Sequence, residues 1–199
     1  MRKIVTSSLL AVAAIFVLNS FRPSVEDVFK VDTTKSKILW TGQNVAGGKH
    51  TGEIAITDGQ LIGDSGKLTA GSFSVAINSI SVTDLTGDRA TRLANHLKSE
   101  DFFEASKFPE ATFKITKVSG AGGNLSITGD LTIKNITKAI MFPATVNQSG
   151  NTLNATAKGI KIDRTQFDIK YRSGNFFSGL GDRAISDEFL LDIELVAAK

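Results

Sequence analysis

The chain has 199 residues, of which 41% are hydrophobic and 22% charged, and its 23 basic and 20 acidic residues give a formal charge of +3. This balance suits one globular domain with a sizeable core, and the basic residues are too dispersed for the concentrated basic surface that nucleic-acid binding needs. The absence of cysteine excludes disulfides, thiolate metal sites, a cysteine nucleophile and a lipid-modified N-terminal cysteine.

Residues 1–20 have the pattern of a secretory signal peptide. Arg2 and Lys3 precede an apolar run from Ile4 to Leu18. A basic start before an apolar stretch of up to about 15 residues is typical of such a signal, and a membrane span needs roughly 18 residues. We therefore expect an exported, periplasmic protein with no stable membrane span after cleavage. A secreted protein and an uncleaved N-terminal anchor are the alternatives.

A linker is expected at residues 21–30, where Arg22, Pro23 and Ser24 interrupt the apolar run. The predicted domain occupies residues 31–199, because from there apolar and polar residues alternate along most of the chain. Successive side chains of a strand point to opposite faces, so this period of two indicates strands. The predicted strands are residues 36–42, 50–57, 59–62, 68–77, 111–118, 124–132, 139–148, 152–162 and 188–197.

One segment breaks the alternation. Between residues 88 and 97, Ala90, Leu93 and Leu97 recur at helical spacing, and Asp88 is a plausible N-cap. We predict a short helix here that covers a barrel mouth or a sheet edge. Many short strands separated by turns are typical of a sandwich or a barrel, and a closed barrel of roughly eight strands is wide enough to hold a small ligand inside.

The sequence carries little catalytic chemistry. Residues 63–66 (GDSG) match the nucleophile motif of chymotrypsin-like proteases, but the same residues favour a hairpin turn, which is the interpretation we prefer. His50 and His96 lie in different predicted elements and fall short of the three or four ligands of a zinc site. We expect hydrogen-bonding histidines, no metal and no cofactor. Arg164 is expected to tie a loop by a salt bridge, and contact with a polar ligand head is the alternative.

The aromatic residues are the stronger signal, since the chain has 13 phenylalanines, one tryptophan and one tyrosine. Core packing is the better explanation for any single phenylalanine on a strand. Phenylalanines in connections are less easily explained in this way, and they are typical of side chains that line or close the mouth of a cavity. The predicted mouth residues are Phe102, Phe103, Phe176 and Phe177.

Four blocks of sequence, found in one order, resemble the YceI-like family. Residues 71–118 contain a strand, a charged helix, a Phe-Phe pair and the run FPEATF; residues 127–134 read ITGDLTIK, 162–167 read IDRTQF, and 186–188 read SDE. The resemblance covers nearly everything from residue 31 to the end of the chain. Asp168, where many relatives carry glycine, and the loop at residues 174–181 (GNFFSGLG) depart from the pattern. These departures bear on the ligand more than on the fold.

The resemblance implies an all-β fold: an antiparallel, lipocalin-like β-barrel of about eight strands with one short helix and an apolar interior cavity. It implies exported or periplasmic binders of polyisoprenoid chains, including isoprenoid quinones and prenyl phosphates, that often form dimers and carry no catalytic residues. The expected function is non-catalytic binding, storage or transport of an amphiphilic isoprenoid lipid, with a homodimer as a further partner. The alternatives are an enzyme acting on a lipid within the barrel and a ligand-free structural or stress-response protein.

The phase of the strands indicates which side chains face the cavity, although a register error of one residue would reverse any assignment. The predicted wall of the cavity consists of Trp40, Phe73, Val75, Ile77, Phe113, Ile115, Leu131, Ile133, Phe189, Leu191 and Ile193.

Overall fold

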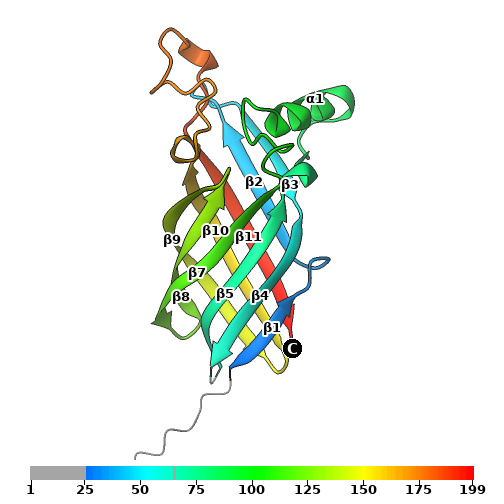
Figure 1. Cartoon of the computed structure of the whole chain (residues 1–199), viewed down its shortest axis with the longest axis vertical. Coiled ribbons are helices and arrows are strands. Elements are labelled where there is room, and N and C mark those ends of the chain that lie inside the picture. Colours follow the sequence, from blue (N-terminus) through cyan, green and yellow to red (C-terminus); the bar gives the residue numbers. More distant parts are fainter. Residues whose placement is uncertain (1–25, 65) are drawn as a thin grey trace, which may run out of the picture.

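Strands wrap around a common axis into a barrel, and one α-helix lies at the end opposite the C-terminus (Figure 1). The computed structural model describes residues 26–64 and 66–199. The expected signal peptide, residues 21–25 of the expected linker and Ser65 of the GDSG motif lie outside the described residues. Within the described part, no helix combines the length and apolar character needed to cross a membrane.

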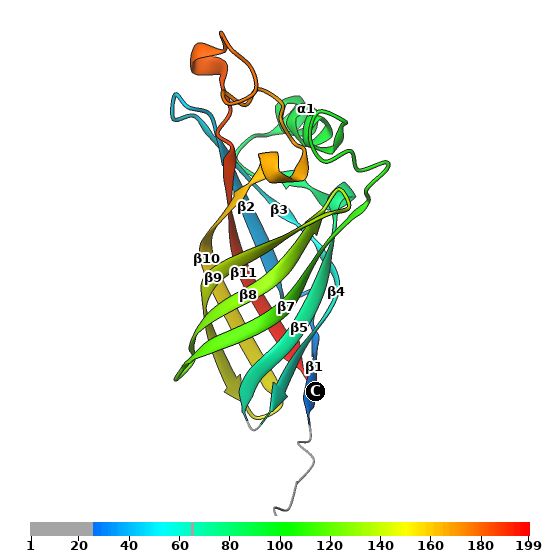
Figure 2. The ribbon, with the colours of Figure 1, turned by 60° about the vertical axis from the view of Figure 1, so that its left-hand side comes forward.

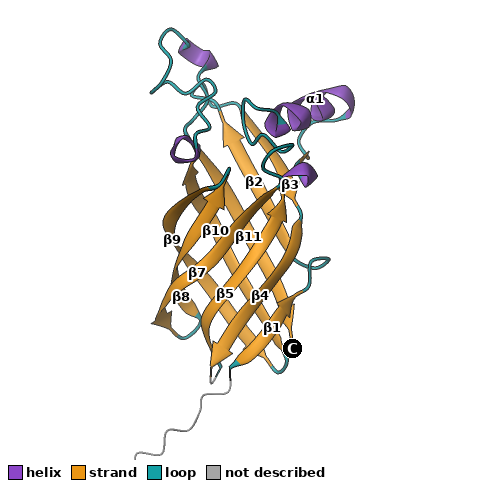
Figure 3. Cartoon of the chain, in the orientation of Figure 1, coloured by secondary structure: helices purple, strands orange, loops and turns teal. Residues whose placement is uncertain are grey.

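The strands are β1 (Asp27–Val31), β2 (Lys37–Gln43), β3 (Lys49–Ile54), β4 (Ile56–Asp64), β5 (Lys67–Ala76), β6 (Ser81–Val82), β7 (Glu110–Ala121), β8 (Asn124–Ile133), β9 (Ile136–Ser149), β10 (Thr152–Asp163) and β11 (Glu188–Ala198). The helix is α1 (Gly87–Lys98), and the short 3-10 helices are η1 (Ile77–Ser79), η2 (Arg164–Phe167) and η3 (Gly181–Arg183). The helices gather at one end of the barrel, as Figure 3 shows.

The barrel closes because β1 pairs with both its neighbours in the ring. The order is β1-β4-β5-β7-β8-β9-β10-β11, with β1 returning to β11 through the pairs Lys30 with Ala198 and Val31 with Ala197. Further along β11, β2 takes the place of β1, and β2 pairs in turn with β3. The segments β1 and β2, and likewise β3 and β4, thus act as interrupted wall strands. All these pairings are antiparallel, which confirms the predicted fold class.

The linker prediction is wrong for residues 27–30, which form most of β1. Phe29 is fully buried and Val31 is 4% exposed, whereas Val28, which points to the opposite face of the strand, is half exposed. The alternation is therefore present, but it spans too few residues to stand out next to Pro23. The strand forms because it fills the gap between β4 and β11.

Two other boundaries differ from the prediction. The break between β3 and β4 lies at Ala55 and not near residue 58, because the Ala55 N–H donates to Ser79 Oγ at 2.7 Å while its carbonyl accepts from the Ala76 N–H at 3.0 Å. Helix α1 matches the predicted segment within a residue, but its N-cap is Thr86. Asp88 lies instead in the first turn, where its charge complements the helix dipole.

Candidate ligand-binding cavity

The barrel is hollow beneath α1. The cavity has a volume of about 550 Å³ and is lined mostly by apolar side chains from the barrel strands, with Leu93 and Leu97 of α1 at its upper end. Small-molecule sites typically measure about 300–1,000 Å³. Figure 2 shows α1 above this end of the barrel. The helix therefore lies at the mouth, which is one of the two positions predicted for it.

The predicted wall residues gather around this cavity with one exception. Ile115 lines a separate space further along the barrel, so its predicted place in the cavity wall is wrong. Phe102 and Phe103 lie at the cavity near α1, as predicted for mouth residues. Their contact with a ligand stays a prediction. The other predicted residues that line the cavity are Trp40, Phe73, Val75, Ile77, Phe113, Leu131, Ile133, Phe189, Leu191 and Ile193.

Phe176 and Phe177 do not line the cavity, so their prediction as mouth residues is wrong. Their side chains are 50% and 51% exposed. Their backbone N–H groups both donate to the carbonyl of Ser173, at 3.1 Å and 3.0 Å, which forms a tight turn in this segment. The segment they occupy projects beyond the barrel end in both views (Figures 1 and 2).

Several lining residues escaped the sequence analysis. Ile140 and Phe142 alternate along β9, and Ile38 lies two positions before Trp40, so extending the period of two would have found them. Leu93 and Leu97 share one face of α1 at a spacing of four. The further lining residues of this group are Ile54, Ile80, Ala111, Ile160 and Ile169.

Three phenylalanines form a floor at the inner end of the cavity. The Phe113 ring lies between the rings of Phe73 and Phe142, with centroid distances of 5.6 Å to each. All three rings line both the cavity and a smaller chamber of about 40 Å³ beyond it. Glycine at position 129 makes room for this arrangement, because a Cβ there would overlap the Phe113 ring. We call these three residues the phenyl floor.

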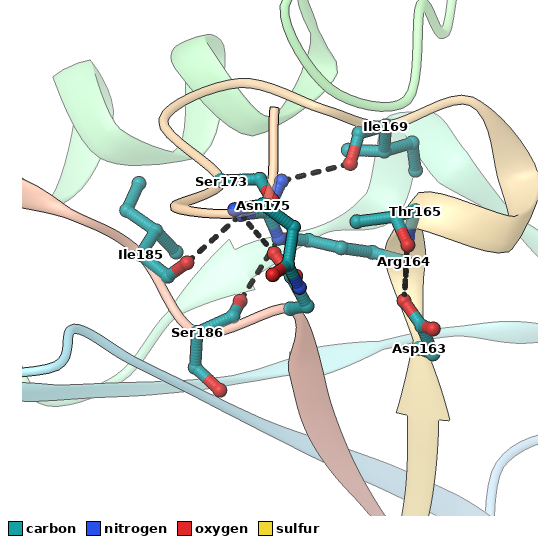
Figure 4. A network of polar contacts seen from close by, with 9 residues as sticks. Asp163, Arg164, Thr165, Ile169, Ser173, Asn175, Ile185 and Ser186 are labelled. Atoms are coloured by element: carbon teal, nitrogen blue, oxygen red, sulfur yellow. Dashed lines mark hydrogen bonds and ion pairs between the residues drawn. The ribbon is translucent and has the colours of Figure 1, made fainter. Parts of the chain in front are cut away.

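Arg164 holds the loops at the mouth together (Figure 4). Its side chain is 4% exposed, and its Nε, Nη1 and Nη2 donate to the carbonyls of Ser186 at 3.0 Å, Ile169 at 2.8 Å and Ile185 at 3.1 Å. Asp187 Oδ1 lies 3.5 Å from Nη2. Burial lowers the pKa of Arg164, and the nearby carboxylates of Asp187 and Asp163 partly oppose that shift. The geometry agrees with the expected loop-tying salt bridge.

Asp163 fixes the turn that presents Arg164. Its Oδ1 accepts from the Thr165 N–H at 2.9 Å and from the Thr165 hydroxyl at 2.6 Å, and Gln166 Nε2 donates to Oδ2 at 3.3 Å. Burial on its own raises the pKa of Asp163, but these hydrogen bonds and the charge of Arg164 outweigh it. The pKa of Asp163 is therefore lower than that of an ordinary aspartate.

This lowered pKa predicts a loss of stability in acid. A carboxylate whose folded pKa lies below its unfolded value of about 3.9 stabilises the fold above that value, and the contribution is lost as the pH falls through the folded pKa. We expect Asp163→Asn to lower the free energy of unfolding by about 1–2 kcal/mol at pH 7. Between pH 5 and pH 2, this variant should lose less stability than the unmodified protein. Urea unfolding at a series of pH values measures this.

The matched control for this experiment is Asp58→Asn on β4, an exposed carboxylate in the wall of the barrel. It should change neither the stability at pH 7 nor the shape of the pH curve. An Asp163→Asn variant whose curve parallels that of the unmodified protein would contradict the assignment.

The two histidines are hydrogen-bonded in different places, as expected. His50 Nδ1 lies 2.8 Å from Asp84 Oδ2, and His96 Nε2 lies 2.9 Å from Asp101 Oδ2. The His96 ring also meets the ring of Tyr171 edge-on at a centroid distance of 4.8 Å, which joins α1 to the loop after η2. Among the described residues, no three side chains that commonly bind metals come together.

Comparisons with known proteins agree with this geometry. A family model for the YceI-like domain matches residues 29–197. The chain is 30% identical to protein YceI of Escherichia coli O157:H7 and of Shigella flexneri over 143 residues, which cover 71% of the chain and 71% of each relative.

Solved structures share the fold. The crystal structure of BcnA from Burkholderia cenocepacia superposes with a TM-score of 0.67 at 24% identity, covering 84% of this chain and 99% of the other. A polyisoprenoid binding domain from Saccharophagus degradans, implicated in plant cell wall breakdown, has a TM-score of 0.63 at 12% identity and covers 85% of this chain and 97% of that domain.

Proposed function

Because the chain belongs to the YceI-like family, we propose that it binds an amphiphilic isoprenoid lipid, of the quinone or polyprenyl type, in its barrel cavity. The observation that supports this most directly is the covered, largely apolar cavity of about 550 Å³. The similarity in fold to a polyisoprenoid binding domain points to the same ligand class.

Burial of hydrocarbon provides the affinity in this proposal. Each buried CH₂ contributes roughly 0.8 kcal/mol, so a chain of several prenyl units binds tightly with few polar contacts. The wall beside the phenyl floor is mainly apolar, from residues such as Leu131, Phe142 and Ile193, while charged side chains such as Lys49 and Arg183 lie toward the mouth. The isoprenoid tail therefore enters the barrel, and the polar head stays near the open end.

The proposed role is storage or transport without chemical change of the lipid. General acid–base catalysis needs a titratable group within hydrogen-bonding reach of the reacting atoms. Arg164 donates to three backbone carbonyls, and His50 contacts Asp84. These candidate groups are thus engaged in structural contacts. Together with the signal-like residues 1–20, this supports an exported lipid carrier or reservoir.

Filling the cavity provides the test. Ala111 on β7 is 5% exposed and lines the cavity, so Ala111→Trp places an indole where the tail would lie. Excluding about four CH₂ groups costs roughly 3 kcal/mol, which is about a hundredfold in affinity. We expect at least that loss in the binding of a fluorescent polyprenyl analogue, measured by titration.

The matched control is Lys114→Trp, on the same strand but on its exposed face. It adds the same indole outside the barrel and should leave the affinity unchanged. If folded Ala111→Trp protein binds the analogue as tightly as the unmodified protein does, the ligand does not occupy this cavity and the proposal is wrong.

A further inference from the structure

Exposed apolar side chains gather at the mouth end of the barrel. Phe176 and Phe177 are half exposed, and Val45, in the connection between β2 and β3, is 62% exposed. The connection between β2 and β3 contacts the chain just after this phenylalanine segment, because the Val45 N–H donates to the Ala184 carbonyl at 3.0 Å. We call residues 174–180 the aromatic loop. It projects from the barrel along its long axis in both views (Figures 1 and 2).

Cations surround the base of the aromatic loop. Lys49, Arg172 and Arg183 line the mouth, and within the described residues none of them forms an ion pair. The neighbouring carboxylate of Asp182 likewise forms no ion pair with a described residue. Lys170 is already paired with Asp168 at 2.6 Å. The balance at the loop base is therefore positive, and it complements an anionic surface.

We propose that this end of the barrel docks on a lipid bilayer that contains anionic phospholipids. Phe176 and Phe177 insert at the level of the head groups, where aromatic rings beside cations are favoured. Lys49, Arg172 and Arg183 contact the phosphates of the head groups. An exposed aromatic pair on a projecting loop thereby gains the apolar surroundings that the barrel does not give it.

A bilayer explains where the loop lies better than a protein partner does. Arg172 and Arg183 flank the aromatic loop and also line the cavity, so docking through the loop places the mouth against the membrane. An isoprenoid tail then passes between bilayer and cavity with little exposure to water. This last step rests on the proposed function, whereas the docking itself does not.

A tryptophan placed on the loop reports insertion directly. Phe176→Trp and Met141→Trp, each made in a Trp40→Phe background so that no other tryptophan emits, are a matched pair, because Met141 is 72% exposed on β9 in the side wall of the barrel. With vesicles of phosphatidylethanolamine and phosphatidylglycerol, we expect the emission of the tryptophan at position 176 to shift to shorter wavelength. Brominated acyl chains should quench it. The tryptophan at position 141 should do neither, and equal behaviour of the two variants would overturn the proposal.

Co-sedimentation with the same vesicles tests the contribution of the rings. The double variant Phe176→Ser/Phe177→Ser should bind at least about tenfold more weakly than the unmodified protein, since each buried ring is worth about 1.5 kcal/mol or more. Met141→Ser should bind normally. Equal binding to vesicles of phosphatidylcholine alone would overturn the role of the cations, and a change of oligomeric state in place of vesicle binding would favour a second copy of the chain as the partner.

The fluorescent polyprenyl analogue, titrated without vesicles, separates the two proposals. The double serine variant should bind the analogue as the unmodified protein does, because neither phenylalanine lines the cavity. If the unmodified protein inserts into vesicles but binds no analogue, the proposed function fails and docking stands. If it binds the analogue but position 176 never inserts, docking fails and the proposed function stands.

Discussion

Replacing Phe113 by alanine is expected to lengthen the isoprenoid chain that the barrel prefers. The Phe113 ring is the middle member of the phenyl floor, so its removal joins the cavity of about 550 Å³ to the chamber of about 40 Å³ and adds the space of the ring itself. At roughly 0.8 kcal/mol per buried CH₂, two additional buried carbons already give about a tenfold gain in affinity. The measurement is a titration with polyprenyl analogues of graded length.

We expect the unmodified protein to stop gaining affinity once the chain reaches the phenyl floor, and Phe113→Ala to continue for about one further prenyl unit. The substitution also costs about 3–5 kcal/mol of stability, as large-to-small core changes do, so Phe142→Ala serves as a second way to open the floor. Phe102→Ala removes an equal ring near α1 and should weaken binding without moving the preferred length. An unchanged length preference in both floor variants would show that the tail ends short of these rings.

The second large effect is expected at Arg164. Arg164→Met should lower the free energy of unfolding by about 3–5 kcal/mol, because it leaves the partly buried carboxylate of Asp187 without its cation and three backbone carbonyls without their donor. Asp187 Oδ1 is already buried without a hydrogen bond from the described residues. Arg164→Lys should restore little of this loss, since one ammonium group cannot reproduce the geometry of three guanidinium donors. Urea unfolding measures both variants.

A surface ion pair provides the comparison. Lys161 Nζ lies 3.2 Å from Glu188 Oε2, and both side chains are more than half exposed. Lys161→Met should cost no more than about 1 kcal/mol, because exposed pairs are screened by water. If Arg164→Met proves as mild as Lys161→Met, Arg164 does not hold the mouth together and its guanidinium is available for another role.

The sequence predicted the wall of the barrel well, because each wall strand faces core on one side and solvent on the other. A period of two then identifies the inward residues, such as Val75 and Ile133, without knowledge of their partners. The same reasoning failed for β1, where burial of Phe29 and Val31 depends on closure between β4 and β11. It also failed at Ile115, whose side chain points inward but lines the smaller chamber beyond the phenyl floor and not the main cavity.

Loops were less predictable, because tertiary contacts decide where they point. Nothing local distinguishes Phe102, which packs at 5.3 Å from the Tyr171 ring, from Phe176, which is exposed. Asp168 is a position where the backbone conformation restricts the choice of residue. Asp168 ends η2 with a φ of 59°, a left-handed conformation that glycine adopts freely and aspartate tolerates.

The volume of the cavity lay beyond pattern reasoning altogether. Whether a barrel of this size is hollow depends on which large side chains meet across it. Here the phenyl floor fills the middle of the barrel, while the upper part stays open beneath α1. A strand pattern gives the direction of each side chain but not the width that these rings leave between them.

Native mass spectrometry of the full chain, purified from its own host without detergent, tests the central claim most directly. The account predicts that the protein retains a lipid whose mass and fragmentation identify an isoprenoid, and that Ala111→Trp protein prepared in parallel retains none. Protein that is always empty after such gentle extraction, and that also takes up no member of a panel of isoprenoid quinones and polyprenyl phosphates, would contradict it.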